Sequence, residues 1–251
     1  MLKSLLLLGL CMALLNVAAG DSEELQALVD ELNIIKTSVN KLLEKINSSM
    51  SSCCKCSGSI VEKDWKLAFR GTPGIKKSVF RAYQDGVGIP EDVEEGCKQV
   101  GQPLPCANHY RNNEILDNWS GFSEVALFVY KNNMEVHHVT FDAIDSTFMN
   151  WLNKSRIKDS TWTDITSEPA NVFSLYGQQK LNLRRTFFLN SNFLSCGDTT
   201  GWFVAIDNER GGCSWEKNTA FPVFKYSTAN TKMNWNSTGI DTADYFAIYV
   251  H

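Results

Sequence analysis

The sequence predicts a mainly β protein: an antiparallel β-sandwich or jelly-roll-like globular domain that is preceded by an α-helical coiled coil. Short runs rich in Val, Phe, Tyr, Trp and Ile recur between turn-rich stretches over residues 64–251, which is typical of such a domain. Apolar residues in residues 22–50 instead follow a strict alternation of three- and four-residue steps, which is typical of a coiled coil.

The clearest local signal in the globular domain is a β-hairpin over residues 124–142. Two aromatic and β-branched runs flank Asn132 and Asn133, which tolerate the positive φ angles of a tight hairpin turn. Strand preference then predicts the remaining strands of the domain. The full set of predicted strands is 65–70, 78–83, 124–131, 135–142, 171–176, 184–190, 201–207, 221–227 and 245–250.

Two short helical segments are also predicted within this domain. Pro90 suits a first helical position, acidic residues follow it, and Gly101 suits the end, so a helix is expected over 90–100. Ser146 is a candidate cap for a turn over 147–153. Most of the tryptophans are expected to pack in the core, and one or two exposed ones would offer a stacking surface for sugar rings.

Residues 1–20 have the pattern of a signal peptide. Lys3 supplies a positive charge, an apolar run follows, and small residues lead to a predicted cleavage after Gly20. The alternative is a membrane anchor, but the apolar run is shorter than the roughly 20 residues that span a bilayer. We therefore expect a secreted protein that does not insert into a membrane. Cleavage would remove Lys3 and take the formal net charge from −4 to −5, which disfavours nucleic-acid binding.

The predicted coiled coil is a self-association segment over residues 22–50. Ser22 is a candidate N-cap, and Glu31 and Lys36 fall where interchain ion pairs form. The alternative is an amphipathic helix that packs on its own domain, but the apolar stripe is narrow. Its mixed Leu and Ile positions favour a trimer. The predicted coiled-coil core is Leu25, Leu28, Leu32, Ile35, Val39, Leu42 and Ile46.

The cysteines predict both internal and interchain disulfides. Removal of Cys11 with the signal peptide would leave an odd number, which in a secreted protein indicates an intermolecular bond or a free thiol. Residues 51–63 hold a cluster and a short linker. A metal site is the alternative for the cluster, but no second half-site lies nearby. We expect Cys97, Cys106, Cys196 and Cys213 to pair as sequence-local internal disulfides, and Cys53, Cys54 and Cys56 to form interchain disulfides.

Candidate glycosylation sites agree with secretion. The Asn-x-Ser/Thr pattern is short, but its repetition in a chain with a predicted signal peptide is informative because the modification occurs in the secretory pathway. The candidate sites are Asn47, Asn118, Asn153 and Asn236.

No nucleophile-elbow, zinc-protease or phosphate-loop motif is present in the sequence, so we expect a protein that is not an enzyme. His137 and His138 are adjacent in a predicted strand and should point to opposite faces. A post-strand loop with Asp207, Asn208 and Glu209 is a candidate Ca²⁺ site, although a solvated turn is the alternative. No other cofactor is expected.

Arg184-Arg185 is a further candidate, because a pair of guanidinium groups can contact an anionic sugar or partner. The alternative for this pair is a solvated strand edge or an internal ion pair.

Several aromatic-rich motifs follow one another along the chain. They are WKLAFRG, CANHYRNNEILDNW, MNWLNKSRIKDSTWTD, RRTFFLN, GWFVAID, CSWEKNTAFPVFKYS and YFAIYV. Together they resemble a secreted domain family of marine invertebrates that occurs in extracellular-matrix and skeletal or shell-matrix settings. This resemblance covers about residues 64–251 and implies a matrix role without implying binding residues. A weaker resemblance links Cys196, Gly201-Trp202 and Cys213 to the fibrinogen-related domain of innate-immune lectins, although Phe203 and the cysteine spacing depart from it.

These observations lead to two functional hypotheses. The first is a secreted, oligomeric extracellular-matrix glycoprotein whose C-terminal heads bind other matrix components. The alternative is a multivalent, lectin-like protein that binds carbohydrate. In both, linking several weakly binding heads would raise avidity by about 10²–10⁴. The expected partners are other copies of the chain and extracellular matrix proteins or glycans.

Overall fold

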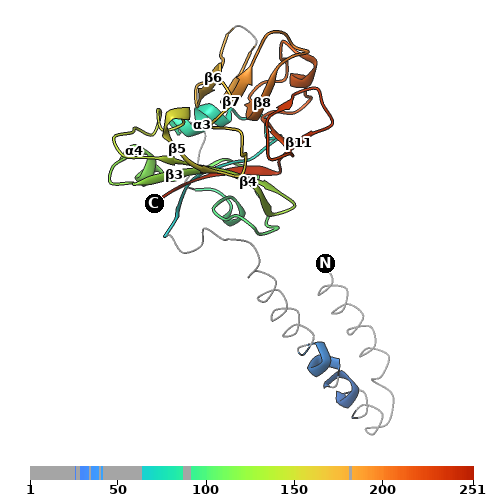
Figure 1. Ribbon diagram of the computed structural model, residues 1–251. Coiled ribbons are helices and arrows are strands. Elements are labelled where there is room, and N and C mark those ends of the chain that lie inside the picture. The colour runs from blue at the N-terminus through green and yellow to red at the C-terminus, as the bar shows by residue number, and fades with distance from the viewer. Residues whose placement is uncertain are drawn as a thin grey trace. The chain divides into compact units, whose positions relative to one another are not determined.

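The computed structural model describes residues 26, 29–33, 35–39, 41, 64–86, 92–180 and 183–251. The chain divides into two compact units, residues 1–62 and residues 63–251. Every described residue of the first unit is helical (Figure 1). Ile35 and Val39 are 54% and 47% exposed, respectively. Self-association through the predicted seam stays a prediction, and Leu25, Leu28, Leu42, Ile46, Asn47, Cys53, Cys54 and Cys56 lie outside the described residues.

The second unit is mainly β, as predicted, and its described part contains two antiparallel sheets (Figure 1). The first, sheet A, joins the first and last strands of the unit, because β1 pairs with β12. This pairing ties the start of the domain to its end. Sheet A has the order β2 (Tyr110–Arg111), β1 (Lys66–Gly71), β12 (Tyr245–Val250), β3 (Glu124–Lys131), β4 (Met134–Asp142) and β5 (Ile157–Ser160).

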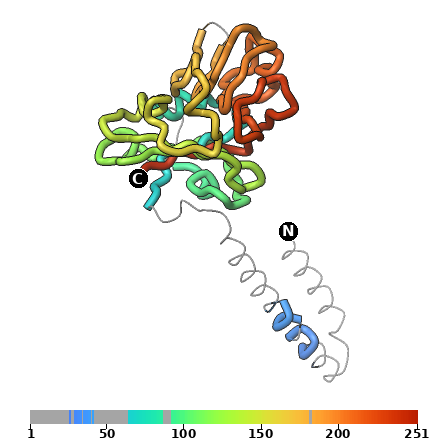
Figure 2. The backbone as a smooth tube through the Cα atoms, viewed as in Figure 1, coloured from blue at the N-terminus to red at the C-terminus, as the bar shows by residue number. Residues whose placement is uncertain are grey.

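Sheet B is formed by the chain that runs between β5 and β12, and Figure 2 shows this passage from yellow to red. Its central strands follow one another as antiparallel neighbours, so most of its contacts are between consecutive strands. Sheet B has the order β11 (Ile240–Thr242), β9 (Val223–Ser227), β8 (Thr200–Ile206), β7 (Arg185–Asn192) and β6 (Val172–Ser174), and β10 (Met233–Asn234) pairs with β8.

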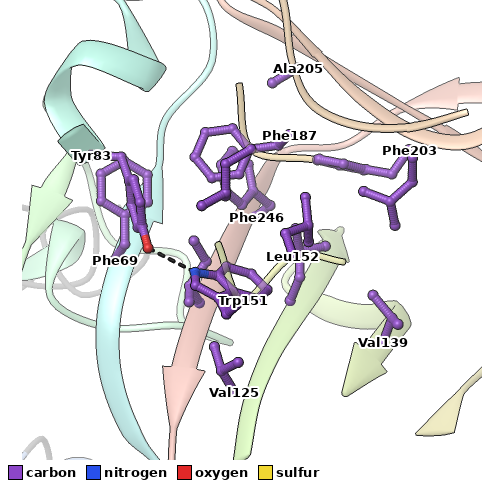
Figure 3. Packing of buried hydrophobic residues seen from close by; sticks show 14 of the residues in the cluster. Phe69, Tyr83, Val125, Val139, Trp151, Leu152, Phe187, Phe203, Ala205 and Phe246 are labelled. Carbon is purple, nitrogen blue, oxygen red and sulfur yellow. Dashed lines mark hydrogen bonds between the residues drawn. The ribbon is translucent and has the colours of Figure 1, made fainter. Parts of the chain in front are cut away.

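The two sheets pack against each other through an aromatic core, part of which is shown in Figure 3. Phe246 of β12 lies at its centre, with ring centroids 5.0 Å from Phe187, 5.5 Å from Phe203 and 4.7 Å from Phe224, all in sheet B. Edge-to-face and tilted contacts of this kind stabilise a core beyond the burial of apolar area alone. The predicted two-sheet sandwich is therefore confirmed at the level of its layers.

The β3–β4 hairpin has the turn that the sequence predicts. Asn132 and Asn133 have φ angles of 53° and 61°. Two consecutive positive φ angles are the mark of a type I′ turn, which matches the twist of the paired strands. The turn places Lys131 opposite Met134 and Tyr130 opposite Glu135, and a register shift between Tyr130 and Val129 then brings Val129 opposite His137.

The outer face of sheet A also carries buried aromatic groups, which alternation alone does not predict. Tyr130 and Tyr245 stack with ring centroids 4.7 Å apart, and the guanidinium of Arg70 lies 4.2 Å from the Tyr245 ring. The backbone N–H of Gly101 donates to the Tyr245 hydroxyl at 2.7 Å, so the loop that precedes β2 reaches this face. β3 is consequently buried on both of its faces.

The strand predicted at 78–83 is wrong, because this segment forms helix α3 (Val79–Asp85). Ser78 caps the helix, since its Oγ accepts from Arg81 N at 3.2 Å, and Gly86 ends it in the left-handed region with φ 63°. Val79, Phe80, Ala82 and Tyr83 are buried at helical spacing. Their apolar pattern also reads as a strand, which explains the error.

The helix predicted over 90–100 reduces, in the described residues, to one 3₁₀ turn, η2 (Glu95–Cys97). Cys97 is bonded to Cys106, and a side chain on Gly96 would meet the Pro105 carbonyl oxygen at 2.2 Å. This close approach pulls the segment away from a regular helix.

The turn predicted over 147–153 is confirmed only near its start, where Asn150 N donates to Thr147 O. The chain then carries Trp151 into the core, where Trp151 Nε1 donates to the Tyr83 hydroxyl at 2.9 Å (Figure 3). The remaining elements are α4 (Asn113–Asp117), η3 (Lys154–Arg156) and η4 (Ser214–Glu216).

Candidate functional site

Both internal disulfides predicted from the sequence are present in the structure. Cys97 bonds to Cys106 and Cys196 bonds to Cys213. Each bond closes a short loop, as the sequence-local pairs suggested. Disulfides fit an extracellular or other oxidising compartment. Within the described residues, no helix is both long enough and apolar enough to cross a membrane.

The described sequon asparagines, Asn118, Asn153 and Asn236, all lie on the surface. Asn153 Oδ1 accepts from both the backbone N and the hydroxyl of Ser155, so it is held within its own sequon. In the other two the side-chain amide nitrogen donates to a backbone carbonyl, Asn118 Nδ2 to Glu114 O at 3.0 Å and Asn236 Nδ2 to Cys196 O at 2.7 Å. Exposure is what a glycan requires, and occupancy stays a prediction.

The Ca²⁺ site predicted at Asp207, Asn208 and Glu209 is not supported. The Asp207 carboxylate is buried and turned toward α3, where it accepts from Ser78 Oγ at 2.5 Å and from Val79 N at 2.9 Å. These bonds occupy the oxygens that a cation would need. Burial raises the pKa of Asp207, which its hydrogen bonds and Arg184 oppose. Among the described residues, no group of three His, Cys, Asp or Glu side chains is arranged to hold a metal ion.

The adjacent histidines point to opposite faces, as predicted. His137 is buried and stacks on Trp162, with ring centroids 4.6 Å apart. His138 lies on the outer face, where Nδ1 is 2.6 Å from Glu135 Oε1 and Nε2 is 3.2 Å from Asp159 Oδ2. Burial lowers the pKa of His138, but the two carboxylates outweigh it and the net shift is upward.

His109 has a structural role in linking two segments. Its Nδ1 accepts from Thr72 N at 3.0 Å, and Nε2 lies 3.0 Å from the carbonyl oxygen of Lys77, to which it donates in the neutral tautomer. Burial lowers the pKa of His109 to about 4, and burial likewise lowers that of His137 to about 4. Both side chains are therefore neutral in the folded protein at neutral pH.

We predict that His109 contributes to acid destabilisation of the head. Its folded-state pKa of about 4 lies below the ordinary value of 6.5, so unfolding takes up a proton between these pH values. Stability is present above pH 6.5 and decreases as pH falls toward 4, by about 1.4 kcal/mol per pH unit for each proton. The variant His109→Gln should show a shallower decrease in urea denaturation measured from pH 7 to pH 4.

His138→Gln provides a matched control of opposite sign. Because the pKa of His138 is raised, its protonated form stabilises the fold at low pH and this contribution decreases as pH rises. Below pH 6.5 this contribution is fully present, so its removal should lower stability there by a nearly constant amount and leave the slope between pH 6.5 and 4 unchanged. A slope in this range that is the same in His109→Gln and the wild type, or one that changes in His138→Gln, would contradict the assignment of these two histidines.

Arg185 is an internal ion-pair residue, which was the alternative considered for Arg184-Arg185. Its Nε and Nη2 donate to the two carboxylate oxygens of Glu216 at 2.5 and 2.8 Å, and both side chains are 1% exposed. The guanidinium also lies 4.9 Å from the Trp215 ring. A bidentate pair with this burial fixes the geometry of the surrounding loops.

The tryptophans are mainly core residues, as expected. Trp202 and Trp235 are at most 2% exposed, and Trp215 is 5% exposed and stacks on Trp235. Trp65 and Trp119 are partly exposed. The cysteine-flanked Gly201-Trp202 segment therefore directs its indole into the protein, where Trp202 Nε1 donates to Asp164 Oδ1 at 2.8 Å. It offers no stacking surface for a sugar.

A pocket in the described residues lies beside the Arg185–Glu216 ion pair. It has a volume of about 450 Å³, within the range of ligand pockets. Two loops form it, and Asn218 N donates to Glu209 O at 3.4 Å between them. We call it the 209–219 pocket, and its lining is Glu209, Arg210, Gly211, Lys217, Asn218 and Thr219.

The buried Glu216 anchors the loops that form this pocket. Its Oε2 accepts from Cys213 N at 2.7 Å, and its backbone oxygen accepts from Asn218 Nδ2 at 2.9 Å. The pocket therefore presents charged and amide groups on a support that is held by the core. Side chains of these types can donate hydrogen bonds to a hydroxylated or anionic ligand and accept hydrogen bonds from its hydroxyl groups.

Sequence reasoning did not identify this pocket. It considered Glu209 only as a Ca²⁺ ligand, and it assigned no role to Arg210, Lys217, Asn218 or Thr219. The one available signal was the Gly211-Gly212 pair between Arg210 and Cys213, which marks a tight loop. The contact between the two loops depends on Glu216, which no motif identifies.

Comparison with known proteins gave no match: no protein-family model, curated protein or solved structure resembles the chain significantly.

Proposed function

We propose that the chain is a secreted, oligomeric extracellular-matrix glycoprotein whose globular heads bind other matrix components. The observation that carries the proposal is the 209–219 pocket, a cavity of about 450 Å³ that is lined by residues with charged and amide side chains and held by the disulfide-stapled core. Surface sequons at Asn118 and Asn153 support passage through the secretory pathway. The resemblance of the aromatic motifs to marine-invertebrate matrix domains agrees with this role.

Oligomerisation is the second part of the proposal. The heptad spacing over residues 22–50 favours self-association, with a trimer preferred, and the cysteines at 53, 54 and 56 would link the chains. Non-reducing gel electrophoresis of the secreted protein should show a disulfide-linked species that dithiothreitol converts to monomer. A band of monomer alone without reductant would contradict covalent oligomerisation.

A lectin-like function is the second candidate, and the same pocket favours it. Arg210 and Lys217 can pair with a sugar carboxylate or sulfate, and Asn218 and Thr219 can hydrogen-bond to hydroxyl groups. Acidic glycans are themselves matrix components, so the matrix and lectin functions differ in whether the head binds a matrix protein or a glycan directly. Binding to isolated glycans favours the lectin. Binding to deglycosylated matrix proteins favours protein recognition.

The test uses the full-length secreted oligomer on a glycan array and on immobilised collagen and matrix extracts. The variant Arg210→Ala/Lys217→Ala should reduce binding by about tenfold or more, since each charged hydrogen bond contributes about 1.5–3 kcal/mol. Lys66→Ala removes an exposed cation from β1 of the other sheet and is the matched control. Unchanged binding by the double variant would exclude the 209–219 pocket.

A further inference from the structure

The two sulfur atoms of the Cys196–Cys213 disulfide lie in different environments. Cys196 is exposed, in the loop between β7 and β8. Cys213 is only 2% exposed and precedes η4. A dissolved thiolate can therefore reach Cys196, whereas the surrounding protein shields Cys213. In thiol–disulfide exchange, Cys196 Sγ is therefore the sulfur that is attacked, because solvent reaches it, and Cys213 Sγ is the sulfur that leaves.

The buried sulfur also has a cationic neighbour. Arg185 Nη2 lies 3.4 Å from Cys213 Sγ. The same nitrogen donates to Glu216 Oε2, and a guanidinium has enough N–H groups to serve both acceptors. The Arg185–Glu216 pair holds this donor in place. A thiolate formed at Cys213 would therefore meet an N–H donor that is already fixed in place, which favours its departure as a leaving group.

The Cys97–Cys106 disulfide has the opposite surroundings and serves as an internal comparison. Cys97 Sγ lies 3.3 Å from the Glu94 carboxylate, and Cys106 Sγ lies 3.0 Å from the carbonyl oxygen of Asn108. Negative atoms at these distances disfavour a thiolate. The neutral hydroxyl of Thr72 lies 3.1 Å from Cys106 Sγ and carries no charge that would favour a thiolate there. Cys97 itself is fully buried.

We propose that Cys196 is a modification site for thiols, at which the Cys196–Cys213 disulfide undergoes exchange. An external thiolate attacks Cys196 Sγ and forms a mixed disulfide with it. The Cys196–Cys213 bond breaks, and its electron pair goes to Cys213 Sγ, which remains as a thiolate beside Arg185. One disulfide replaces another, so the step needs no oxidant. A second thiolate can attack the mixed disulfide, releasing the external thiol as its disulfide and leaving Cys196 reduced.

Opening this bond leaves the loop attached to the domain. Asn236 Nδ2 donates to Cys196 O at 2.7 Å, and Asn234 Nδ2 donates to Gly197 O at 2.5 Å. Thr199 O accepts from Trp235 N at 3.0 Å on the strand side of the loop. The head therefore keeps its fold while Cys196 carries the attached group. Small thiols such as glutathione and exposed thiols of proteins share the chemistry that this site accepts.

The test exposes the full-length protein to reduced glutathione, stops the reaction with N-ethylmaleimide and maps every cysteine by peptide mass spectrometry. We expect glutathione on Cys196 and N-ethylmaleimide on Cys213, with this bond opening at least about tenfold faster than Cys97–Cys106. Peptides with the cysteines at 53, 54 and 56 are read separately. Glutathione mainly on Cys213, or equal opening of the two disulfides, would overturn the proposal.

Two variants test the electrostatic part. Glu94→Gln removes an exposed carboxylate beside Cys97, so it should accelerate opening of Cys97–Cys106 several-fold and leave Cys196–Cys213 unchanged. Arg185→Lys should slow opening of Cys196–Cys213, with circular dichroism confirming the fold. If Arg185→Lys does not fold, the cysteine map of the wild type and the rates measured for Glu94→Gln test the proposal without it. An unchanged rate of opening of Cys97–Cys106 in Glu94→Gln would remove the electrostatic explanation.

A second arm with a cysteine-containing peptide in place of glutathione tests whether protein thiols react at the same site.

Discussion

Glu216→Gln is expected to destabilise the head domain by about 3–5 kcal/mol, because it leaves the charge of Arg185 buried without its counterion. Arg185 and Glu216 are each 1% exposed and form a bidentate pair. Solvent cannot replace the lost carboxylate at this burial. Glutamine keeps the size of the side chain, so the loss reports charge rather than volume. Urea denaturation of the wild type and variant, followed by tryptophan fluorescence, measures the difference.

Glu95→Gln is the matched control, since Glu95 also pairs with a cation but is 74% exposed in its ion pair with Lys98. Exposed pairs of this kind contribute little because water screens them. The urea concentration at the unfolding midpoint of Glu95→Gln should equal that of the wild type. A double variant, Arg185→Met/Glu216→Leu, should recover much of the stability lost in Glu216→Gln, because no unpaired charge remains. Equal losses in Glu216→Gln and the double variant would show that packing, rather than charge, dominates.

Glu216→Gln should also affect the 209–219 pocket. Glu216 Oε2 accepts from Cys213 N on one loop, and Glu216 O accepts from Asn218 Nδ2 on the other. Glutamine has one acceptor oxygen in place of two, so it cannot keep both the contact to Cys213 N and the bidentate contact to Arg185. The stability of the head and the shape of the pocket therefore depend on the same side chain, and ligand binding should weaken together with stability.

Strand positions were predictable where the apolar pattern had a single interpretation. The β3–β4 hairpin was predictable, because Asn132 and Asn133 fix the turn between its two strands. The segment 78–83 was not predictable, because its apolar residues fit both a strand and a helix. Contacts with residues far away in the sequence determine which of the two forms. Asp207 supplies one of them by accepting from Val79 N and Phe80 N at the start of α3. A sequence pattern does not reveal a cap that comes from a residue so far along the chain.

The short strands β2, β5, β10 and β11 were missed for a related reason. β5 reads IKDS and β11 reads IDT, with polar residues that lack strand preference. Their pairing with β4 and β9 supplies the backbone hydrogen bonds that hold them extended. Pairing with neighbouring strands therefore makes these segments extended, and the local sequence does not encode this pairing.

The functional residues divide in the same way. The internal disulfides were predictable because each pair is close in sequence. The partner of Arg185 was not, because Glu216 is 31 residues away and carries no motif. The Ca²⁺ hypothesis failed because three oxygen-bearing residues in a row say nothing about where their side chains point. Asp207 turns inward to α3, while Glu209 lines the 209–219 pocket.

Phe246→Ala is expected to destabilise the head domain by about 3–5 kcal/mol, as is typical when a large core aromatic residue becomes alanine. Phe246 is fully buried and joins the two sheets through Phe187, Phe203 and Phe224. A cavity at this point removes contacts from both layers at once. The opposing strand cannot fill it, since β1 faces Phe246 with Gly71 in register.

Gly71 explains why this site resists repacking. A side chain added at Gly71 would meet Phe246 Cε1 at 2.4 Å, so the phenyl ring occupies the space that a larger residue on β1 would need. Gly71→Ala should therefore destabilise the wild type but cost less in the Phe246→Ala background, where the added methyl group enters the cavity. Met134→Ala, at a 65% exposed position in β4, is the surface control. Additive effects of the two core substitutions in chemical denaturation would contradict this account of the contact between β1 and β12.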